Sequence, residues 1–393
     1  MNWSKRLDRD ALIAFAQRLV QTPSPSTQEG AVAALLAEEM QRLGYDEVRV
    51  DVMGNVIGRI GPANSRRLLF DGHMDTVGIG EEAAWPRAPY GGEIADGVLY
   101  GRGAADMKGA LAAMVYAGRL LAESATSLRG ALYIAAVVQE EPCEGVALRH
   151  IVEQEGVWPD WVVIGEATNL QIARGQRGRI ELAVEVQGRS CHAAAPERGV
   201  NAIYEASRLV VGLELLGLQL NQDSFLGRGA LAVTQIHAEA GSRNVVPDLC
   251  RLTVDRRLTI GETEAKALTE VRRVLTREGI KGKVEVPLYR AQSYTGWPVE
   301  APQTFPYWIT SEDEPLLLAA SRVIESELGF LPRLGRWDFS TDGVYTMGVA
   351  GIPTIGFGPG EERYAHTVEE QVRVRDLVSA AQVYAALAQQ LLS

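Results

Sequence analysis

A histidine and an aspartate follow an apolar segment near residue 70 and raise the first question of chemistry. Residues 68–77 read LLFDGHMDTV, which places His73 and Asp75 two positions apart. Side chains two positions apart in an extended chain point to the same side. The pair is therefore either a solvated strand end or a metal-binding imidazole with a carboxylate that orients it.

Other acids and a second histidine follow further apolar segments. Asp106 lies in YGRGAADMKG, Glu140 and Glu141 follow IAAVVQ, Glu166 follows WVVIG, and His366 lies in GPGEERYAHTVEE. A single acid at a strand end is more often a solvated surface group than a ligand. In open α/β sheets, however, ligands bind beyond the carboxyl ends of the strands. The sequence therefore predicts that these side chains meet at one edge of a sheet.

The segments that must position these residues alternate between helix and strand. Residues 26–44 predict a helix, with Ser26 and Glu29 at the spacing of a capping box and Gly44 at the stop. A second helix is expected after Asp106. The runs RLLFDGH, GALYIAAVVQEE and DWVVIGEA are apolar throughout, which is typical of strands buried on both faces. The fold class expected is α/β, with a mostly parallel mixed sheet covered by helices on both faces.

The pattern changes after residue 178. RIELAVEVQG alternates strictly, which indicates a sheet with one packed face, and the following segments predict the order βαββαβ of a ferredoxin-like unit. Helix and strand alternate again after residue 291. We expect a catalytic domain of residues 1–178 and 292–393, with residues 179–291 inserted as an α+β lid and dimerisation domain.

Together these motifs resemble one enzyme family. The series H-x-D, GRGxxDxKG, EE, GExT and a late GPG with HT is similar to the co-catalytic zinc hydrolases that include acetylornithine deacetylase, succinyl-diaminopimelate desuccinylase, aminoacylase and carboxypeptidase G. The resemblance covers nearly the whole chain. Within this family, the chain most resembles a subgroup of selenium-metabolism hydrolases, whose substrate is poorly defined. The segments that carry this resemblance are QEEPCEG, RGQRGRIE, CHAAAPERG and WDFSTDGV.

The resemblance implies two Zn²⁺ ions per subunit, although Co²⁺ or Mn²⁺ also accepts such ligands. Asp106 would bridge the ions, with His73 and Glu166 on one and Glu141 and His366 on the other. Two zinc ions of this kind clamp the oxygens of a hydrolytic transition state and lower the pKa of a water molecule.

Further roles follow for residues near the ligands. Asp75 is expected to accept the other ring N–H of His73 and so fix its tautomer. Adjacent residues of a strand point opposite ways, so Glu140 and Glu141 cannot both be ligands of one metal ion unless a turn intervenes. Glu141 is expected to bind metal and Glu140 to act as the general base.

The inserted segment supplies the remaining candidates, which rest on the resemblance. His192 is expected to stabilise the oxyanion, and Asn244 and Arg257 to hold the substrate, since an arginine fork suits a carboxylate. Arg256 competes with Arg257 for that role. In the family, the lid histidine of one subunit serves the metals of its partner. The apolar helix YEASRLVVGLELLGLQL also has more apolar residues than one face needs, which predicts a homodimer through the insert.

Composition limits the partners. The chain has 393 residues and a net charge of −11, which argues against nucleic acid or an anionic membrane as partner. Its three cysteines form no CxxC pair and no apolar leader or membrane span is visible, so a cytoplasmic location is expected. No role is assigned to the cysteines, and His150 and His237 are expected to be structural.

The sequence thus predicts a metal-dependent hydrolase that cleaves the amide bond of a small N-acyl amino acid or related carboxylate. An exopeptidase with the same two-metal centre, either a carboxypeptidase or a dipeptidase, is the alternative. A non-catalytic metal-binding or ligand-binding protein on this fold is the alternative outside the enzymes.

Overall fold

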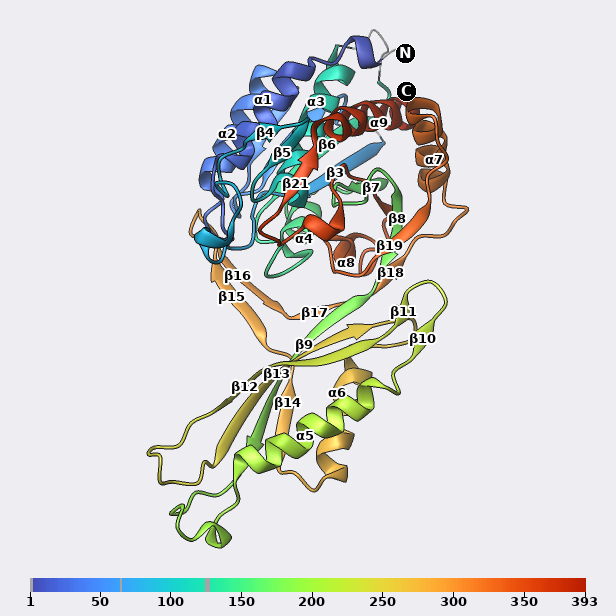
Figure 1. Cartoon of the computed structure of the whole chain (residues 1–393). Coiled ribbons are helices and arrows are strands. Elements are labelled where there is room, and N and C mark those ends of the chain that lie inside the picture. Colours follow the sequence, from blue (N-terminus) through green and yellow to red (C-terminus); the bar gives the residue numbers. More distant parts are fainter. Residues whose placement is uncertain (1–2, 64–65, 124–127) are drawn as a thin grey trace.

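The computed structural model describes residues 3–63, 66–123 and 128–393. It has a large body from which a smaller arm, the lid, extends (Figure 1). In the described residues, the body is built on a nine-stranded mixed sheet in the order β1-β2-β6-β3-β7-β20-β8-β18, with β19 beside β8. These strands are β1 (Glu47–Val50), β2 (Val56–Ile60), β3 (Arg67–His73), β6 (Ala131–Val137), β7 (Trp161–Ile164), β8 (Ile172–Gln176), β18 (Trp308–Ile309), β19 (Leu334–Trp337) and β20 (Thr354–Gly356).

The centre of this sheet is parallel. Strand β3 pairs in parallel with both β6 and β7, and β7 with β20, whereas β1, β2 and β18 pair antiparallel. Side chains of β6 are buried along the whole strand, which explains its unbroken apolar sequence. In the β3–β6 register His73 lies opposite Val137. The carboxyl ends of these strands therefore meet at one edge, where the candidate residues follow.

Helices cover the sheet, which confirms the predicted fold class. Helix α3 packs against α1 and α9, and α4 packs against α8; Figure 1 shows the first group above the sheet and the second below it. Close packing of α3 depends on small residues: a Cβ at Gly118 would lie 2.1 Å from the hydroxyl of Tyr45. The helices of the body are α1 (Arg9–Val20), α2 (Gly30–Arg42), α3 (Gly109–Ala122), α4 (Val146–Glu153), α7 (Pro315–Leu328), α8 (Gly343–Thr346) and α9 (Val374–Leu392).

The expected capping box is wrong. Helix α2 begins at Gly30, and its N-cap residue Glu29 makes no side-chain capping bond. The Ser26 hydroxyl donates instead to Asp75 Oδ2 at 2.7 Å, and Glu29 Oε1 accepts the amide of Gln139 at 3.1 Å. Both residues therefore support the sheet edge rather than the helix terminus.

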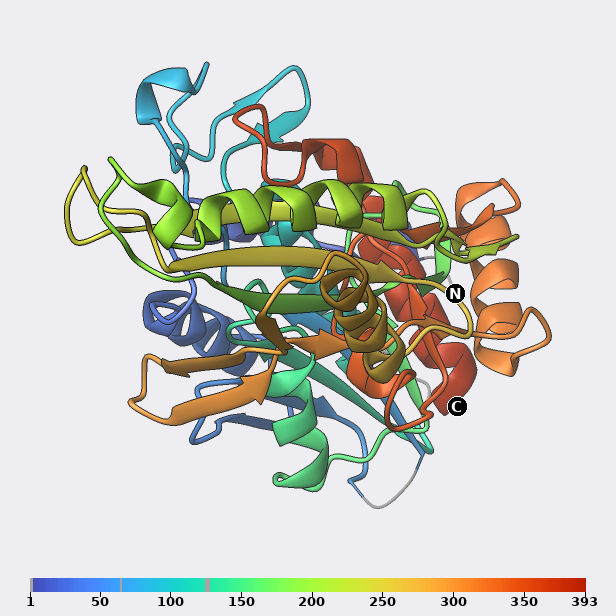
Figure 2. The ribbon, with the colours of Figure 1, turned by 90° about the horizontal axis from the view of Figure 1, so that it is seen from below.

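The lid contains an antiparallel sheet in the order β12-β13-β9-β14. With two crossover helices, this is the strand order of a ferredoxin-like unit. Strand β9 buries every second residue, as its alternation predicts, and Figure 2 shows α5 and α6 on one side of the strands. The elements are β9 (Gly178–Gln187), α5 (Ala202–Gly217), β12 (Ala230–Ala238), β13 (Leu249–Leu258), α6 (Glu264–Arg277) and β14 (Gly282–Glu285).

Short strands form one three-stranded sheet and two hairpins in the described part of the chain. They are β4 (Ile94–Ala95), β5 (Val98–Tyr100) and β21 (Gln371–Arg373) in one sheet, the hairpin of β10 (Gln222–Asp223) and β11 (Gly227–Arg228), and the hairpin of β15 (Leu288–Gln292) and β16 (Pro298–Pro302). Strand β17 (Thr304–Phe305) pairs with β9, so the chain still contacts the lid sheet after residue 291. We propose residues 1–178 and 292–393 as the two segments of the body and residues 179–291 as the lid. None of the helices in the described residues combines the length and the apolar character that crossing a bilayer requires.

Candidate active site

A cavity of about 390 Å³ opens where the parallel strands end and the lid begins. Six acids, two arginines and one histidine are among its walls. The lining residues are Asp106, Glu140, Glu141, Glu144, Glu166, Arg179, Arg257, Phe339, Ser340, Glu362, Ala365 and His366. The predicted acids of the sheet edge are therefore brought together with residues of the lid.

Asp106 lies between two histidines from distant parts of the chain. Its Oδ1 lies 2.9 Å from His73 Nε2, and its Oδ2 lies 3.0 Å from His366 Nε2. Each oxygen thus faces a different imidazole, which is the arrangement that a bridging carboxylate requires. The backbone amide of Asp106 donates to Glu370 Oε1 at 3.1 Å, and Arg102 pairs with the other oxygen of Glu370. This buried ion pair holds the loop that presents Asp106.

The remaining candidate ligands complete two groups around this aspartate. Glu166 Oε1 lies 3.3 Å from His73 Nε2, and Glu141 Oε2 lies 3.1 Å from His366 Nε2. The grouping agrees with the division expected from the sequence, His73 with Glu166 and His366 with Glu141. Ligand atoms of His73, Asp106 and Glu141 also lie within 4.8 Å of one another.

A turn carries the two adjacent glutamates. Strand β6 ends at Val137, and Gln139 has a φ of 55°, so the backbone no longer alternates as a strand does. Both Glu140 and Glu141 therefore line the cavity. Glu140 is buried, and its Oε1 has no hydrogen-bond partner among the described residues. One carboxylate oxygen is thus free to interact with a ligand.

Side chains of three other segments hold this turn. Four successive backbone amides donate to them: Val138 to Asn55 Oδ1, Gln139 to Glu29 Oε1, Glu140 to Asp75 Oδ1 and Glu141 to Asp75 Oδ2, at 3.0–3.2 Å. Buried amides must find acceptors, and carboxylates are the strong ones. The turn is therefore fixed from outside β6.

Asp75 serves this turn more directly than it serves His73. The His73 Nδ1 lies 2.8 Å from the backbone carbonyl of Asp75 and 3.6 Å from its carboxylate. The nearest acceptor for the ring N–H is therefore the carbonyl, not the expected carboxylate. The carboxylate lies closer to the amides of Glu140 and Glu141. The conformation of the loop after His73 decides which acceptor lies nearest the ring, and the two-residue spacing of His73 and Asp75 does not reveal it.

The electrostatics of the cavity reflect an excess of negative charge. Burial raises the pKa of Glu166 to about 7, and repulsion from Asp106 adds to the shift. Burial also raises the pKa of Glu140 well above its usual range. Burial alone would raise the pKa of Asp106, but hydrogen bonds from His366 and His73 outweigh it and lower that pKa.

These observations fit a pair of divalent cations. Two imidazole nitrogens and several carboxylate oxygens form a donor set that zinc, cobalt and manganese accept. Buried carboxylates repel one another, and a cation among them would relieve that repulsion. Hydrogen bonds to Asp106 and Glu141 raise the pKa of His366 to about 10, which shows how strongly this site favours positive charge.

The lid contributes one of the two competing arginines to the cavity. Arg257 lines it, and its guanidinium donates twice to Asp255, at 2.7 and 3.1 Å. Arg256 has a side chain only 1% exposed and pairs with Glu262 at 2.6 Å inside the lid. In β13, Arg256 falls on the same face as Leu252, Val254 and Leu258. The alternation of buried residues along β13 therefore places Arg256 inside the lid and Arg257 on the opposite face.

Six of the cavity residues are not predicted from the sequence, among them Arg179 and Glu144. Arg179 Nη1 lies 2.9 Å from Glu144 Oε1, and both line the cavity. In the lid sheet Arg179 is directly opposite Arg257. Like charges at such positions repel unless acids lie between them, and Asp255 lies 3.5 Å from Arg179. Only the strand register reveals this grouping.

His192 and Asn244 lie elsewhere. Neither lines the cavity. His192 is exposed and bridges to Val245, while the amide of Ala193 donates to the carbonyl of Asn244 at 2.8 Å. The loops that carry them, between β9 and α5 and between β12 and β13, lie at the free end of the lid (Figure 1). The chain's own cavity is therefore lined without these two predicted residues.

Comparisons with known proteins agree with this architecture. The model of peptidase family M20/M25/M40 matches residues 69–390. The chain is 41% identical over 373 residues to the uncharacterized protein YgeY of Escherichia coli K12, covering 95% of this chain and 92% of that protein. It is 30% identical over 383 residues to succinyl-diaminopimelate desuccinylase of Cereibacter sphaeroides, covering 95% and 96%.

Solved structures share the fold. An M20 family metallo-carboxypeptidase from Sulfolobus solfataricus superposes with a TM-score of 0.76 at 17% identity, covering 96% of this chain and 98% of that one. Aminopeptidase PepT from Bacillus cereus superposes with a TM-score of 0.74 at 22% identity, covering 98% and 99%. The family match spans most of the chain, including the five candidate ligands. The chain belongs to peptidase family M20/M25/M40, a family of metal-dependent amide and peptide hydrolases.

Proposed function

We propose that the protein hydrolyses the amide bond of a small N-acyl amino acid or related carboxylate, using two Zn²⁺ ions. One observation carries the proposal: the two oxygens of Asp106 face His73 and His366 at 2.9 and 3.0 Å inside a cavity, beside a buried glutamate with a free oxygen. His73, Asp106 and Glu166 would hold one ion, and Asp106, Glu141 and His366 the other. When bound, the ions supply Lewis acidity and ionise water near neutral pH.

The residues of the chain divide the chemistry. Glu140 accepts a proton from the attacking water as the oxygen of that water bonds to the amide carbon. It then gives the proton to the nitrogen as the C–N bond breaks, so that a carboxylic acid and an amine are released. The raised pKa of Glu140 suits a residue that both takes and gives a proton, since burial stabilises its protonated form. The turn fixed by Asp75 keeps the base beside the metal ligands.

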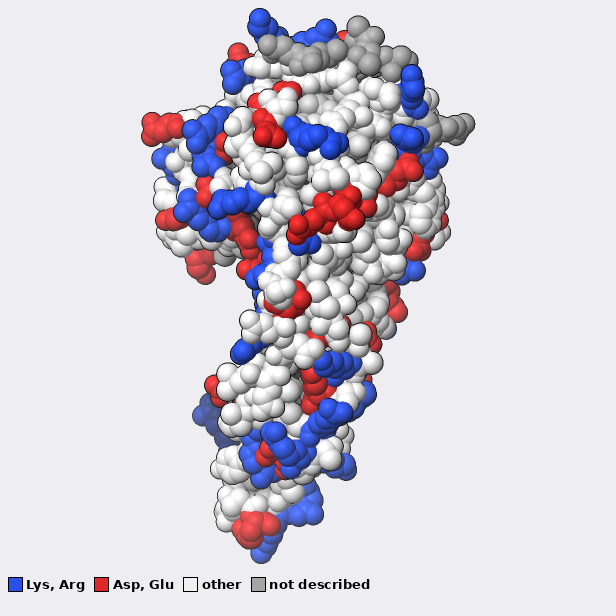
Figure 3. Space-filling view, turned by 90° about the vertical axis from the view of Figure 1, so that its right-hand side faces the viewer, with Lys and Arg blue, Asp and Glu red and all other residues white. Residues whose placement is uncertain are grey.

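The substrate is proposed to carry a carboxylate. Arg257 is the wall residue that suits it, because its fork already binds a carboxylate, that of Asp255, through two hydrogen bonds. A small anionic molecule fits a cavity of about 390 Å³. On the face shown in Figure 3, basic and acidic side chains are interspersed, whereas a nucleic-acid site needs a continuous basic surface.

A homodimer would bring His192 and Asn244 to the site. Strand β12 is an edge of the lid sheet, and helix α5 exposes Tyr204, Val211 and Leu215 at helical spacing, followed by its exposed C-cap residue Leu218. Exposed apolar surface beside an open strand edge favours pairing with a second copy. We propose that His192 of one subunit stabilises the oxyanion in the cavity of its partner, and that Asn244 contacts the same substrate.

The three free cysteines suit a cytoplasmic location.

One assay tests the function. The purified protein is loaded with Zn²⁺ and offered N-acyl amino acids, dipeptides and the methyl esters of both, with release of free amine as the readout. Fastest release from N-acyl amino acids with a free carboxylate supports the proposal. Faster release from dipeptides identifies the exopeptidase instead. If metal binds and no amide is cleaved, the protein is a binding protein on this fold.

The Arg257→Ala variant tests the carboxylate site in the same assay. Activity on free carboxylates is expected to fall much more than activity on their methyl esters, because only the former lose a bidentate ion pair. Arg179→Ala is the matched comparison on the opposite strand. Equal losses on acids and esters in Arg257→Ala would remove this residue from substrate recognition.

A further inference from the structure

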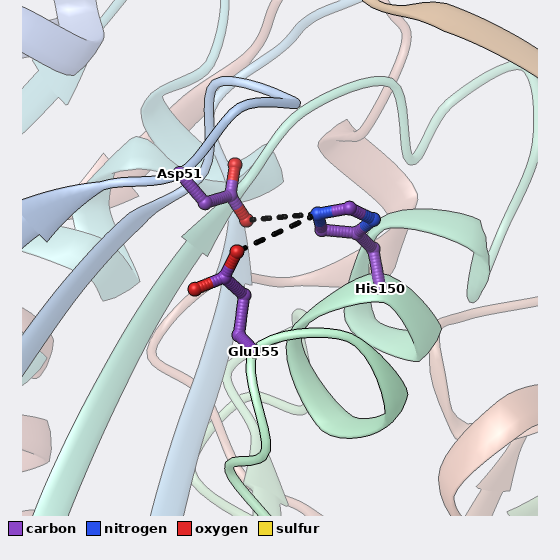
Figure 4. Close-up of side chains that lie close together, drawn as sticks. All are labelled: Asp51, His150 and Glu155. Carbon is purple, nitrogen blue, oxygen red and sulfur yellow. Dashed lines mark ion pairs between the residues drawn. The ribbon is translucent and has the colours of Figure 1, made fainter.

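A second cluster of metal-ligating side chains lies outside the candidate active site. It consists of Asp51, His150 and Glu155, hereafter the outer cluster, and Figure 4 shows the two carboxylates facing the same imidazole nitrogen. Asp51 follows β1, His150 lies in α4, and Glu155 comes two residues after that helix ends. None of the three lines the cavity around Asp106. The outer cluster is therefore a separate feature.

The distances in the outer cluster are too long for hydrogen bonds. His150 Nε2 lies 4.0 Å from Asp51 Oδ2 and 3.8 Å from Glu155 Oε1. A hydrogen bond between nitrogen and oxygen spans about 2.7–3.2 Å. A proton shared between these groups therefore does not explain their arrangement. Such spacing is instead that of ligand atoms placed around an ion.

An ion fits between the three atoms. They are separated by 4.0 Å, 3.8 Å and at most 4.8 Å, so the point equidistant from all three is no more than about 2.5 Å from each. Zinc bonds nitrogen at about 2.0–2.1 Å and carboxylate oxygen at about 2.0–2.2 Å. Side-chain movements of a few tenths of an ångström therefore bring all three ligands to bonding distance.

The imidazole nitrogen has no other partner among the residues that the structure describes. His150 Nε2 is buried and makes no hydrogen bond among the described residues, and the side chain as a whole is 11% exposed. The ring packs edge-on against Trp297, with centroids 5.9 Å apart, which holds its orientation. A buried nitrogen without a partner is costly, and a cation would satisfy it.

The two carboxylates are already held by other groups in a way that leaves ligand positions open. Asp51 Oδ1 accepts the amides of Gly54 and Asn55, and Oδ2 accepts the Asn55 side chain at 2.8 Å. Arg49 pairs with Glu155 Oε2, so Oε1 is the oxygen that faces His150. Carboxylate ligands of metals are commonly oriented by such outer hydrogen bonds.

We propose that the outer cluster binds one divalent transition-metal ion, with water completing its coordination. One nitrogen and two carboxylate oxygens suit Zn²⁺, Co²⁺ or Mn²⁺. The ion would join the loop after β1 to the end of α4, and α4 begins directly after the turn that carries Glu140 and Glu141. Its role is structural, and it does not depend on the proposed hydrolysis.

Zinc binding to the full-length protein tests the site. Wild type and His150→Ala are stripped with chelator, titrated with Zn²⁺ alone and analysed for tightly bound zinc per chain after gel filtration. We expect His150→Ala to bind one ion fewer than wild type and to retain hydrolytic activity. His237→Ala is the control, since it removes an exposed histidine 3.9 Å from a single acid, Glu239. That variant is expected to bind as many ions as wild type.

A second variant guards against misfolding. Glu155→Gln keeps the side-chain volume and removes the charge, and it is expected to weaken binding of the same ion at least tenfold, with an unchanged circular dichroism spectrum. The proposal is overturned if wild type and His150→Ala hold equal zinc, or if His237→Ala loses the ion as well. Because the readout is a difference of one ion, it holds whatever number binds around Asp106.

Discussion

The carboxylate of Asp75 accepts a hydrogen bond from the backbone amide of Glu140, at 3.1 Å. Its second oxygen accepts the amide of Glu141 at 3.2 Å and the hydroxyl of Ser26 at 2.7 Å. One buried carboxylate thus fixes the proposed base and a proposed ligand at the same time. We propose that Asp75 is a positioning residue, which keeps the turn in place through these hydrogen bonds.

Replacing Asp75 tests this role. Asp75→Asn presents an amide N–H to a backbone N–H, and losing a charged hydrogen bond costs about 1.5–3 kcal/mol. We expect kcat to fall roughly 10- to 100-fold with little change in KM. Ser26→Ala, which removes only a neutral donor to the same carboxylate, should have a smaller effect. Equal losses in the two variants would contradict the positioning role.

The Glu140→Gln variant separates metal binding from proton transfer. It keeps the volume of the side chain and removes the basic oxygen. Turnover is expected to fall roughly 10²- to 10⁴-fold, the usual contribution of a positioned proton-transfer group, while zinc content stays that of wild type. Steady-state kinetics and elemental analysis measure the two quantities. Activity within a few-fold of wild type would remove Glu140 from the mechanism.

The buried Glu29 should make folding stability depend on pH. Burial raises its pKa from 4.5 to about 7, and the negative charge of Asp75 adds to the shift. Between these values the folded chain holds a proton that the unfolded chain has released, so the contribution of this residue to stability falls as pH rises from 4.5 to 7. At pH 7.5 the loss is up to about 3 kcal/mol.

Glu29→Gln removes this titration and keeps the oxygen that accepts the amides of Thr27 and Gln139. The free energy of unfolding, measured in urea at several pH values, should converge for wild type and variant near pH 4.5. It should favour the variant increasingly toward pH 7.5. A constant difference across this range would show that Glu29 has no raised pKa in the folded protein.

Much of this site could be predicted because parallel strands end at the same edge of a sheet. Residues at the carboxyl ends of such strands therefore lie close together, even when they are far apart in the sequence. His73 ends an apolar strand, Glu141 and Glu166 follow two others, and the strand order brings those ends together. Arg179 and Glu144 could not be found in this way, because their grouping with Arg257 depends on the register between β9 and β13.

Local motifs misled where tertiary contacts competed with them. Ser26 and Glu29 have the spacing of a capping box, yet their side chains bond Asp75 and the amide of Gln139, where buried groups need partners. The sequence predicts a structural role for His150, and only the distances to Asp51 and Glu155 point to a ligand role.

Subunit mixing tests whether the lid acts on a partner. His192→Ala and Glu140→Gln are each expected to be nearly inactive. If His192 serves the cavity of the other subunit, a mixed dimer has one doubly damaged site and one intact site, so activity should reappear on mixing. Exchange is verified with differently tagged chains. No recovery despite exchange, or a stable monomer in light scattering, would contradict the proposal.

Asp106 is proposed to bridge two metal ions, and anomalous diffraction at the zinc edge would locate both of them. Crystals of the zinc-loaded protein should show two peaks at this site, one on each side of the Asp106 carboxylate. They should lie about 3.5–4 Å apart, the separation in two-metal hydrolytic sites. One peak should lie beside His73 and Glu166, and the other beside Glu141 and His366. A single peak, or none between these residues in an active, zinc-loaded crystal, would contradict a bridging role for Asp106.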